Sequence, residues 1–279
     1  MSTQANTYPV FTAEMKKTHT ILIPGMLPLH FNLLKSALQS CGYKAEILQN
    51  SDRDVIETGL RYVNNDICYP ALLVIGQLIS ALQSGKYDLE HTALMLSQTG
   101  GGCRASNYIY LLRKALEKAG LGHIPIISLN VNGMQEQPGF KLNLEMLRKF
   151  LAAVVYGDAL MYLTNKIRPY EITAGQTDEL AQKWLQKLDI AFKDGKAQAL
   201  STVFNLTSSL AKEFAAIPVQ AKEKIKVGIV GEIYIKYAGL GNNNLEKFLQ
   251  KQDCEYMLPG LFSFVMYCVD TVSYTHLTL

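Results

Sequence analysis

The stretch TALMLSQTGGGCRASNY, residues 92–108, places a short apolar run directly before three consecutive glycines and a single cysteine. The apolar run, 92–97, is typical of a buried strand, and helical spacing of apolar residues follows over 107–120. Ligands of open α/β sheets bind at the carboxyl ends of the strands, where backbone N–H groups and a helix N-terminus favour anionic groups. We therefore expect a binding site at this loop.

The same alternation of strands and helices extends to both sides of the loop. Short apolar runs predict strands at 20–24, 44–48 and 124–130, and apolar residues at helical spacing predict helices at 29–41 and 69–82. Alternation of this kind is typical of an α/β fold, in which a parallel sheet is covered by helices on both faces.

The glycine loop lacks the common nucleotide-binding motifs. GxxxxGK[ST] is absent from the chain and GxGxxG is absent from the loop, which argues against a phosphate cradle of either type. Instead, Cys103 follows the glycines and Arg104 follows Cys103. A neighbouring cation and a helix N-terminus both favour the thiolate, which is the form of cysteine that binds metals.

The cysteines are five in number and contain no CxxC pair. An odd count without an export signal predicts reduced thiols, and any shared metal site must collect cysteines from distant parts of the chain. Cys68 stands at a predicted helix start, as Cys103 does, although alone it is also typical of a small buried apolar residue. Cys41 and Cys254 favour this structural interpretation.

Composition argues against two classes of partner. The chain has 279 residues, 48% of them hydrophobic, and a formal charge of +3, so it can bury the core of one or two domains. It has no long basic run, which gives no reason to expect nucleic acid. No apolar stretch approaches the roughly 18 residues of a membrane span, and the first residues lack the apolar region of a secretory signal. We expect a cytoplasmic protein.

The expected secondary structure changes after residue 142. No strand is expected over 142–216, whereas the stretch KIKVGIVGEIYIKY, 224–237, begins with a strong strand that opens a second α/β unit. That unit is too short to close, and the last residues resemble translated sequencing-adaptor read-through. We expect five segments: an N-terminal extension at 1–17, a first α/β domain at 18–141, a helical region at 142–223, the start of a second α/β domain at 224–268 and a non-native tail at 269–279.

Two further side chains are candidates for a site. Glu232 follows the expected strand of the second domain, where site residues are common, although the position by itself favours a cap or loop carboxylate. His30 could face the crevice at the end of the first strand, although we expect a partly exposed helix residue there instead.

Three stretches together, YVNNDICYPALLVIGQ (62–77), LSQTGGGCRASNYIYLLRKAL (96–116) and the region 227–268, resemble the 2-hydroxyacyl-CoA dehydratase family. More narrowly, they are similar to the dehydratase-like region of the long acyl-CoA dehydratase activases, also called CoA-substrate-specific enzyme activases. The resemblance covers about residues 9–268. It implies flavodoxin-like or Rossmann-like α/β domains and a [4Fe-4S] cluster. Its ligands would be Cys68, Cys103 and Cys268, and the residues around it would be Gly100, Gly101, Gly102 and Arg104.

The resemblance also implies a function. In this family an ATP-driven activase injects a low-potential electron, which the cluster passes to a 2-hydroxyacyl-CoA thioester, and a ketyl radical then expels the hydroxyl group. Expected partners are an acyl-CoA substrate or a dehydratase subunit, together with an ATPase activase domain. ATP would bind only to that domain, which this chain lacks, so we expect the chain to be an internal fragment.

Two alternatives remain open. One is a non-catalytic domain that carries a structural cluster and docks the ATPase part onto a partner. The other is a zinc site with three cysteines and one histidine or water, a ligand set that structural zinc sites use.

Overall fold

The computed structural model of the chain describes residues 8–64, 66–97, 108–129 and 137–267. Its contacts define two compact units, which are described separately. Unit 1 comprises Met1–Met26 and Cys41–Leu142, and unit 2 comprises Leu27–Ser40 and Asn143–Leu279. The helix expected at 29–41 therefore belongs by its contacts to unit 2, although in sequence it lies between two strands of unit 1.

Unit 1 is built on a parallel sheet of four described strands, β1 (Thr20–Ile23), β2 (Lys44–Ile47), β3 (Thr92–Ser97) and β4 (Ile126–Leu129). Their order is β2-β1-β3-β4, and every neighbouring pair is parallel. This confirms the predicted α/β class. The order is that of flavodoxin-like sheets, in which the chain reverses its direction of winding between β1 and β3.

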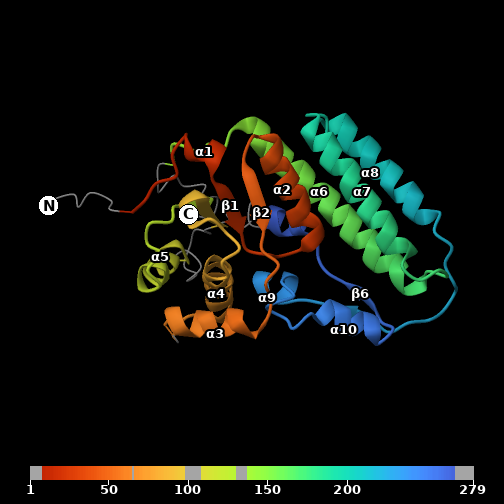
Figure 1. Cartoon of the computed structure of the whole chain (residues 1–279). Helices are drawn as coiled ribbons and strands as arrows, with labels where there is room; N and C mark the ends of the chain where they lie inside the picture. The colour runs from red at the N-terminus through yellow and green to blue at the C-terminus, as the bar shows by residue number, and fades with distance from the viewer. Residues whose placement is uncertain (1–7, 65, 98–107, 130–136, 268–279) are drawn as a thin grey trace, which may run out of the picture. The chain divides into compact units, whose positions relative to one another are not determined.

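The helices of unit 1 are α1 (Met15–Thr18), α3 (Arg53–Tyr62), α4 (Tyr69–Gln83) and α5 (Tyr108–Lys118), with a short 3₁₀ turn at Leu89–His91. Helix α4 is buried on nearly all sides, and α3 crosses it at close range (Figure 1). Glycines make this approach possible: a Cβ on Gly76 would overlap the carbonyl oxygen of Val55, and one on Gly59 would lie 2.6 Å from the carbonyl oxygen of Leu72.

Unit 2 contains three long helices that lie side by side (Figure 1): α6 (Leu144–Ile167), α7 (Gln176–Lys193) and α8 (Leu200–Ala215). They are interrupted near RPYE and KDGKA, as the sequence predicts, by the 3₁₀ turn Arg168–Tyr170 and by Gly195 in a left-handed conformation. Helix α2 (Pro28–Ser40) packs against α6 and α7. Their shared core includes the buried rings of Trp184, Tyr156, Phe192 and Phe214.

The last described part of unit 2 contains β5 (Lys226–Gly228), α9 (Ile233–Tyr237), α10 (Leu245–Lys251) and β6 (Glu255–Met257), with β5 and β6 paired in parallel. Residues 261–267 are helical. The strand expected at the start of 224–237 is present as β5, and Glu232 follows it as expected. The residues after Glu232 form α9, because the Glu232 carboxylate accepts a hydrogen bond from the Ile235 N–H and starts a helix.

Candidate functional site

The carboxyl ends of β1 and β3 lie next to each other in the sheet of unit 1, because the two strands pair in parallel. They flank the point at which the strand order reverses, and such points hold the ligand crevice in open α/β sheets. The predicted site residues Gly100, Gly101, Gly102, Cys103 and Arg104 follow β3 in the chain but lie outside the described residues. The described part of the candidate site therefore consists of what surrounds Cys68.

Cys68 occupies the N-cap position of α4, with an extended backbone (φ −63°, ψ 144°), and its side chain is half-buried. Its sulfur lies 3.3 Å from the hydroxyl oxygen of Tyr108. Tyr108 is the first residue of α5 and follows Cys103 by five residues in the sequence. The Cys68 thiol is thus in contact with α5, which follows the glycine-rich stretch in the sequence.

The N-terminus of α4 gives the Cys68 sulfur an electropositive neighbour. A helix of 15 residues presents unpaired backbone N–H groups and a partial positive charge at its first turn. The Cys68 side chain makes no capping hydrogen bond to those groups. The sulfur is partly exposed and lies beside the first turn of a helix, and both features are found at reactive and ligating cysteines.

The other described cysteines differ from Cys68. Cys254 is buried, with its sulfur 3.5 Å from the carbonyl oxygen of Gln252, and Cys41 is half-buried next to the end of α2. Among the described residues, no three His, Cys, Asp or Glu side chains are arranged to hold a metal ion. Of the predicted ligands, only Cys68 belongs to these residues, and Cys103 and Cys268 lie outside them.

Glu232 is the N-cap residue of α9, where its exposed carboxylate lies 2.9 Å from the Ile235 backbone nitrogen. The capping contact explains why a carboxylate stands at position 232, so no bound ligand is needed to account for it. Tyr234 and Tyr237, on the helix that Glu232 starts, are buried in unit 2.

Replacing Glu232 with alanine is expected to lower the free energy of unfolding by about 1 kcal/mol, the usual effect of removing an N-cap side chain. Urea unfolding followed by circular dichroism would measure this change. Glu223→Ala is the matched control, because Glu223 is an exposed carboxylate of the preceding segment and its loss should change stability by less than about 0.5 kcal/mol. Equal effects of the two variants would contradict the capping role.

The expected exposure of His30 is wrong. It is fully buried in α2, rather than partly exposed, and its Nε2 lies 2.7 Å from Oδ1 of Asp158 on α6. The apolar pattern of α2 does not reveal this contact, because Asp158 is 128 residues away in the sequence. Sequence reasoning did not single out Asp158 at all.

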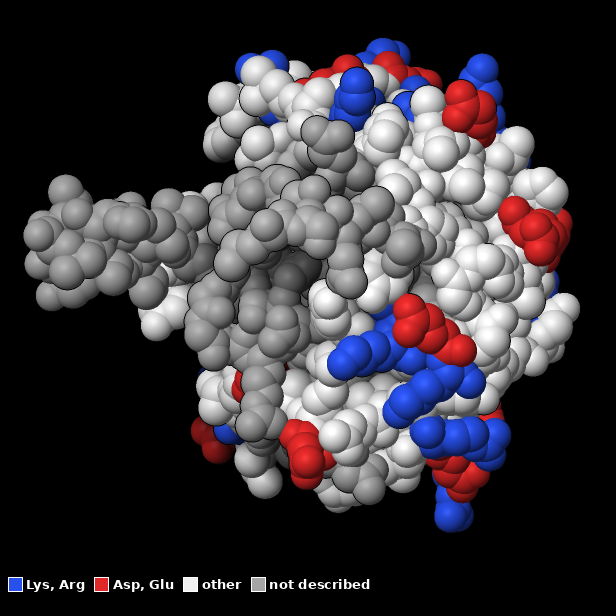
Figure 2. All heavy atoms as spheres, turned by 90° about the vertical axis from the view of Figure 1, so that its left-hand side faces the viewer, with Lys and Arg blue, Asp and Glu red and all other residues white. Residues whose placement is uncertain are grey.

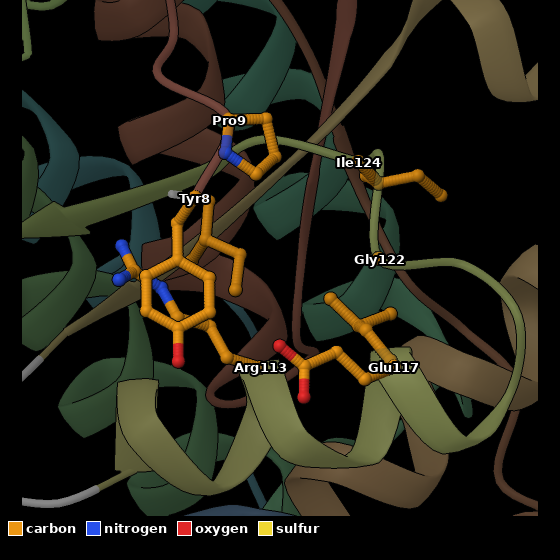
Figure 3. Close-up of a pocket in the computed structure, with 8 residues that line it drawn as sticks. Tyr8, Pro9, Arg113, Glu117, Gly122 and Ile124 are labelled. Carbon is orange, nitrogen blue, oxygen red and sulfur yellow. The ribbon is translucent and has the colours of Figure 1, made fainter. Parts of the chain in front are cut away.

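A small, partly open cavity and a larger open groove lie among the described residues of unit 1. The cavity lies where the ring of Tyr8 covers the guanidinium of Arg113 at 4.1 Å (Figure 3), and its volume of about 10 Å³ is that of one water molecule. The groove, of about 490 Å³, is lined by carboxylates that include Glu46 and Asp54. Both carboxylates already accept hydrogen bonds from side chains of this protein: Glu46 from Lys86, and Asp54 from Ser80.

Charges of both signs lie on the face shown in Figure 2. Figure 2 shows basic and acidic side chains next to one another on the visible face, in line with a formal net charge of only +3. Among the described helices, none is both long enough and apolar enough for a membrane crossing.

Comparison with known proteins finds no relative: no family model, curated protein or solved structure matches the chain.

Proposed function

We propose that the chain is an iron–sulfur protein of the 2-hydroxyacyl-CoA dehydratase and activase family. Cys68, Cys103 and Cys268 would hold a [4Fe-4S] cluster that serves electron transfer to acyl-CoA thioesters, or their reductive dehydration. The observation that carries the proposal is the contact between the Cys68 sulfur and Tyr108, at the start of the helix that follows the glycine-rich stretch. Acyl-CoA and an ATPase activase domain are the proposed partners.

The surroundings of Cys68 fit a cluster ligand. Iron–sulfur clusters are held by cysteine thiolates, and hydrogen bonds to the sulfurs together with solvent exposure tune their potentials. Cys68 supplies a half-buried sulfur at a helix N-terminus, and the Tyr108 hydroxyl is within hydrogen-bonding distance of it. A bound cluster would supply one-electron chemistry at low potential. The protein would supply the thiolates, the hydrogen-bond donor and the electropositive end of α4.

Iron and acid-labile sulfide in the anaerobically purified protein test the proposal. We expect about four of each per chain, together with an electron paramagnetic resonance signal after reduction. Zinc without sulfide would contradict the proposal and support the zinc alternative. A change of the signal on addition of a 2-hydroxyacyl-CoA would support an enzyme, whereas a signal that does not respond would support the cluster-bearing docking domain.

Replacing Tyr108 with phenylalanine is expected to leave the iron content unchanged and to make the cluster's reduction potential more negative. Loss of a hydrogen bond to a ligating sulfur leaves the added electron less well stabilised. A redox titration followed by electron paramagnetic resonance would measure the change. Tyr110→Phe is the control, because Tyr110 lies on the same helix and is 57% exposed. If both variants keep the wild-type potential, the Tyr108 hydroxyl does not act on the cluster.

A further inference from the structure

Two histidines of unit 1 lie next to each other at the amino ends of neighbouring strands. His19 directly precedes β1 and His91 directly precedes β3, and these strands are parallel neighbours with Thr20 opposite Thr92. The centres of the two imidazole rings are 5.6 Å apart. The candidate site described above is at the carboxyl ends of the same strands, so this pair of histidines is separate from it.

A carboxylate fixes the orientation of the His91 ring. Nδ1 of His91 lies 2.7 Å from Oδ2 of Asp88, and Oδ1 of Asp88 accepts a hydrogen bond from the Glu90 N–H. The contact with His91 lowers the pKa of the Asp88 carboxyl, which is therefore ionised at neutral pH. An ionised carboxylate only accepts, so Nδ1 carries the ring proton and Nε2 has the lone pair. Histidines that bind metal ions are commonly oriented by a carboxylate in this way.

A hydroxyl group orients the His19 ring. Nδ1 of His19 lies 2.9 Å from Oγ1 of Thr18, and that hydroxyl donates to the carbonyl oxygen of Glu14 over 3.4 Å. A hydroxyl has only one proton to donate, so Oγ1 of Thr18 accepts from the Nδ1–H of His19. The lone pair of His19 is therefore on Nε2, as it is in His91. Among the described residues, neither Nε2 has a hydrogen-bond partner.

The surroundings of His19 favour the neutral imidazole. Its side chain is nine-tenths buried, with the ring of Phe11 packed edge-on against it. Burial, and next the neighbouring His91, lower the pKa of His19, while Asp88 opposes them. A metal ion binds the neutral ring, because protonation removes the lone pair. The His91 side chain is 56% exposed, so an ion can reach the pair from solvent.

The spacing of the rings fits one shared ion. Zinc binds imidazole nitrogens at about 2.0–2.1 Å, so the ring centres of two such ligands on a tetrahedral ion are about 5–6 Å apart. The observed separation is 5.6 Å. Imidazole suits zinc, copper and nickel ions. No third His, Cys, Asp or Glu ligand joins the pair within the described part of the chain, and water would occupy the remaining positions.

We propose that His19 and His91 bind a divalent transition-metal ion, such as Zn²⁺, through their Nε2 atoms, and that Asp88 is a positioning residue for His91. The ion would join the residues that precede β1 and β3. It would thereby stabilise unit 1, since a ligand that binds only the folded state favours that state. The proposal is independent of the iron–sulfur function, because it uses none of the cysteines.

The test is a calorimetric titration of the full chain with Zn²⁺ alone. We expect the wild type to bind one Zn²⁺ more per chain than His91→Ala. His123→Ala is the matched control, because His123 is another exposed histidine of unit 1 shortly before a strand, and this variant should match the wild type. Equal zinc binding by His91→Ala and the wild type would overturn the proposal and assign the bound zinc to other ligands, such as the cysteines.

Nuclear magnetic resonance of the imidazole nitrogens identifies the ligands in the unmodified chain. We expect Zn²⁺ to shift the Nε2 signals of His19 and His91, while Nδ1 of each ring stays protonated and the His123 signals do not move. Unchanged Nε2 signals of His19 and His91 at saturating Zn²⁺ would overturn the proposal whatever the variants show.

Asp88→Asn tests the positioning role. Asparagine keeps an oxygen that can accept from the Glu90 N–H, so the turn should still form, but it lacks the charge of the carboxylate. Loss of such a partner lowers metal affinity by about 10–100-fold, and we expect at least tenfold weaker binding at unchanged stoichiometry. Wild-type affinity in this variant would show that Asp88 does not position His91 for the ion.

Thermal unfolding tests the stabilising effect of the ion. Zn²⁺ should raise the unfolding midpoint of the wild type and of His123→Ala by more than that of His91→Ala. His91 is half-exposed, so its replacement should leave the midpoint without zinc nearly unchanged. An equal increase of the midpoint in all three proteins would contradict a stabilising ion at this pair.

Discussion

Replacing Cys68 with serine is expected to remove most of the bound iron and sulfide while leaving the helical content unchanged. The substitution exchanges the thiol of a proposed ligand for a hydroxyl at nearly constant size. Cys68 is the N-cap residue of α4, and serine is among the preferred N-cap residues. Helix α4 should therefore be at least as stable as before, and the loss of the cluster would report on the sulfur alone.

Iron and sulfide per chain, measured together with circular dichroism, would check this expectation. Cys103→Ser should behave as Cys68→Ser does, since both are proposed ligands. Cys41→Ser and Cys254→Ser are the controls, and both should keep the wild-type iron content. Full iron content in Cys68→Ser would show that this residue is not a ligand.

Replacing Gly76 with alanine is expected to destabilise unit 1 by about 2 kcal/mol, the upper end of the overpacking cost less the gain in helix propensity. Alanine inside a helix gains about 1 kcal/mol over glycine from its higher helix propensity. Overpacking costs about 1–3 kcal/mol, occasionally more. Here the new Cβ would meet backbone atoms, the carbonyl oxygen of Val55 and the nitrogen of Gly59, which cannot rotate away as a side chain can. Overlap therefore outweighs propensity, and α3 has to move away from α4.

Urea unfolding, together with hydrogen exchange at the amides of unit 1, would measure this loss of stability. Gly122→Ala makes the same chemical change in the same unit, but there the Cβ would lie 3.5 Å from Cγ of Glu117, an ordinary contact. That variant should keep its stability within about 0.5 kcal/mol. If Gly76→Ala and Gly122→Ala change the free energy of unfolding equally, α3 and α4 do not cross as closely as described.

Most of the strands and long helices could be predicted from the sequence, because their signals are local. The run TALMLS forms β3 over the predicted residues 92–97, and RPYE and KDGKA mark the ends of α6 and α7. Apolar periodicity and helix-breaking residues act within a few positions of the chain, so they can be recognised without tertiary contacts. The strand predicted to open the unit after residue 224 is likewise present, as β5, and ends before Glu232.

For the candidate site too, some features could be predicted from the sequence and others could not. The sequence by itself determined the α/β class and singled out Cys68, a residue whose position before a helix can be read from its neighbours. Only the tertiary structure decided that the Cys68 sulfur meets Tyr108, 40 residues away, and that His30 is buried against Asp158. Such contacts depend on which helix faces pack together, and packing is set by the combined fit of many side chains rather than by any local pattern.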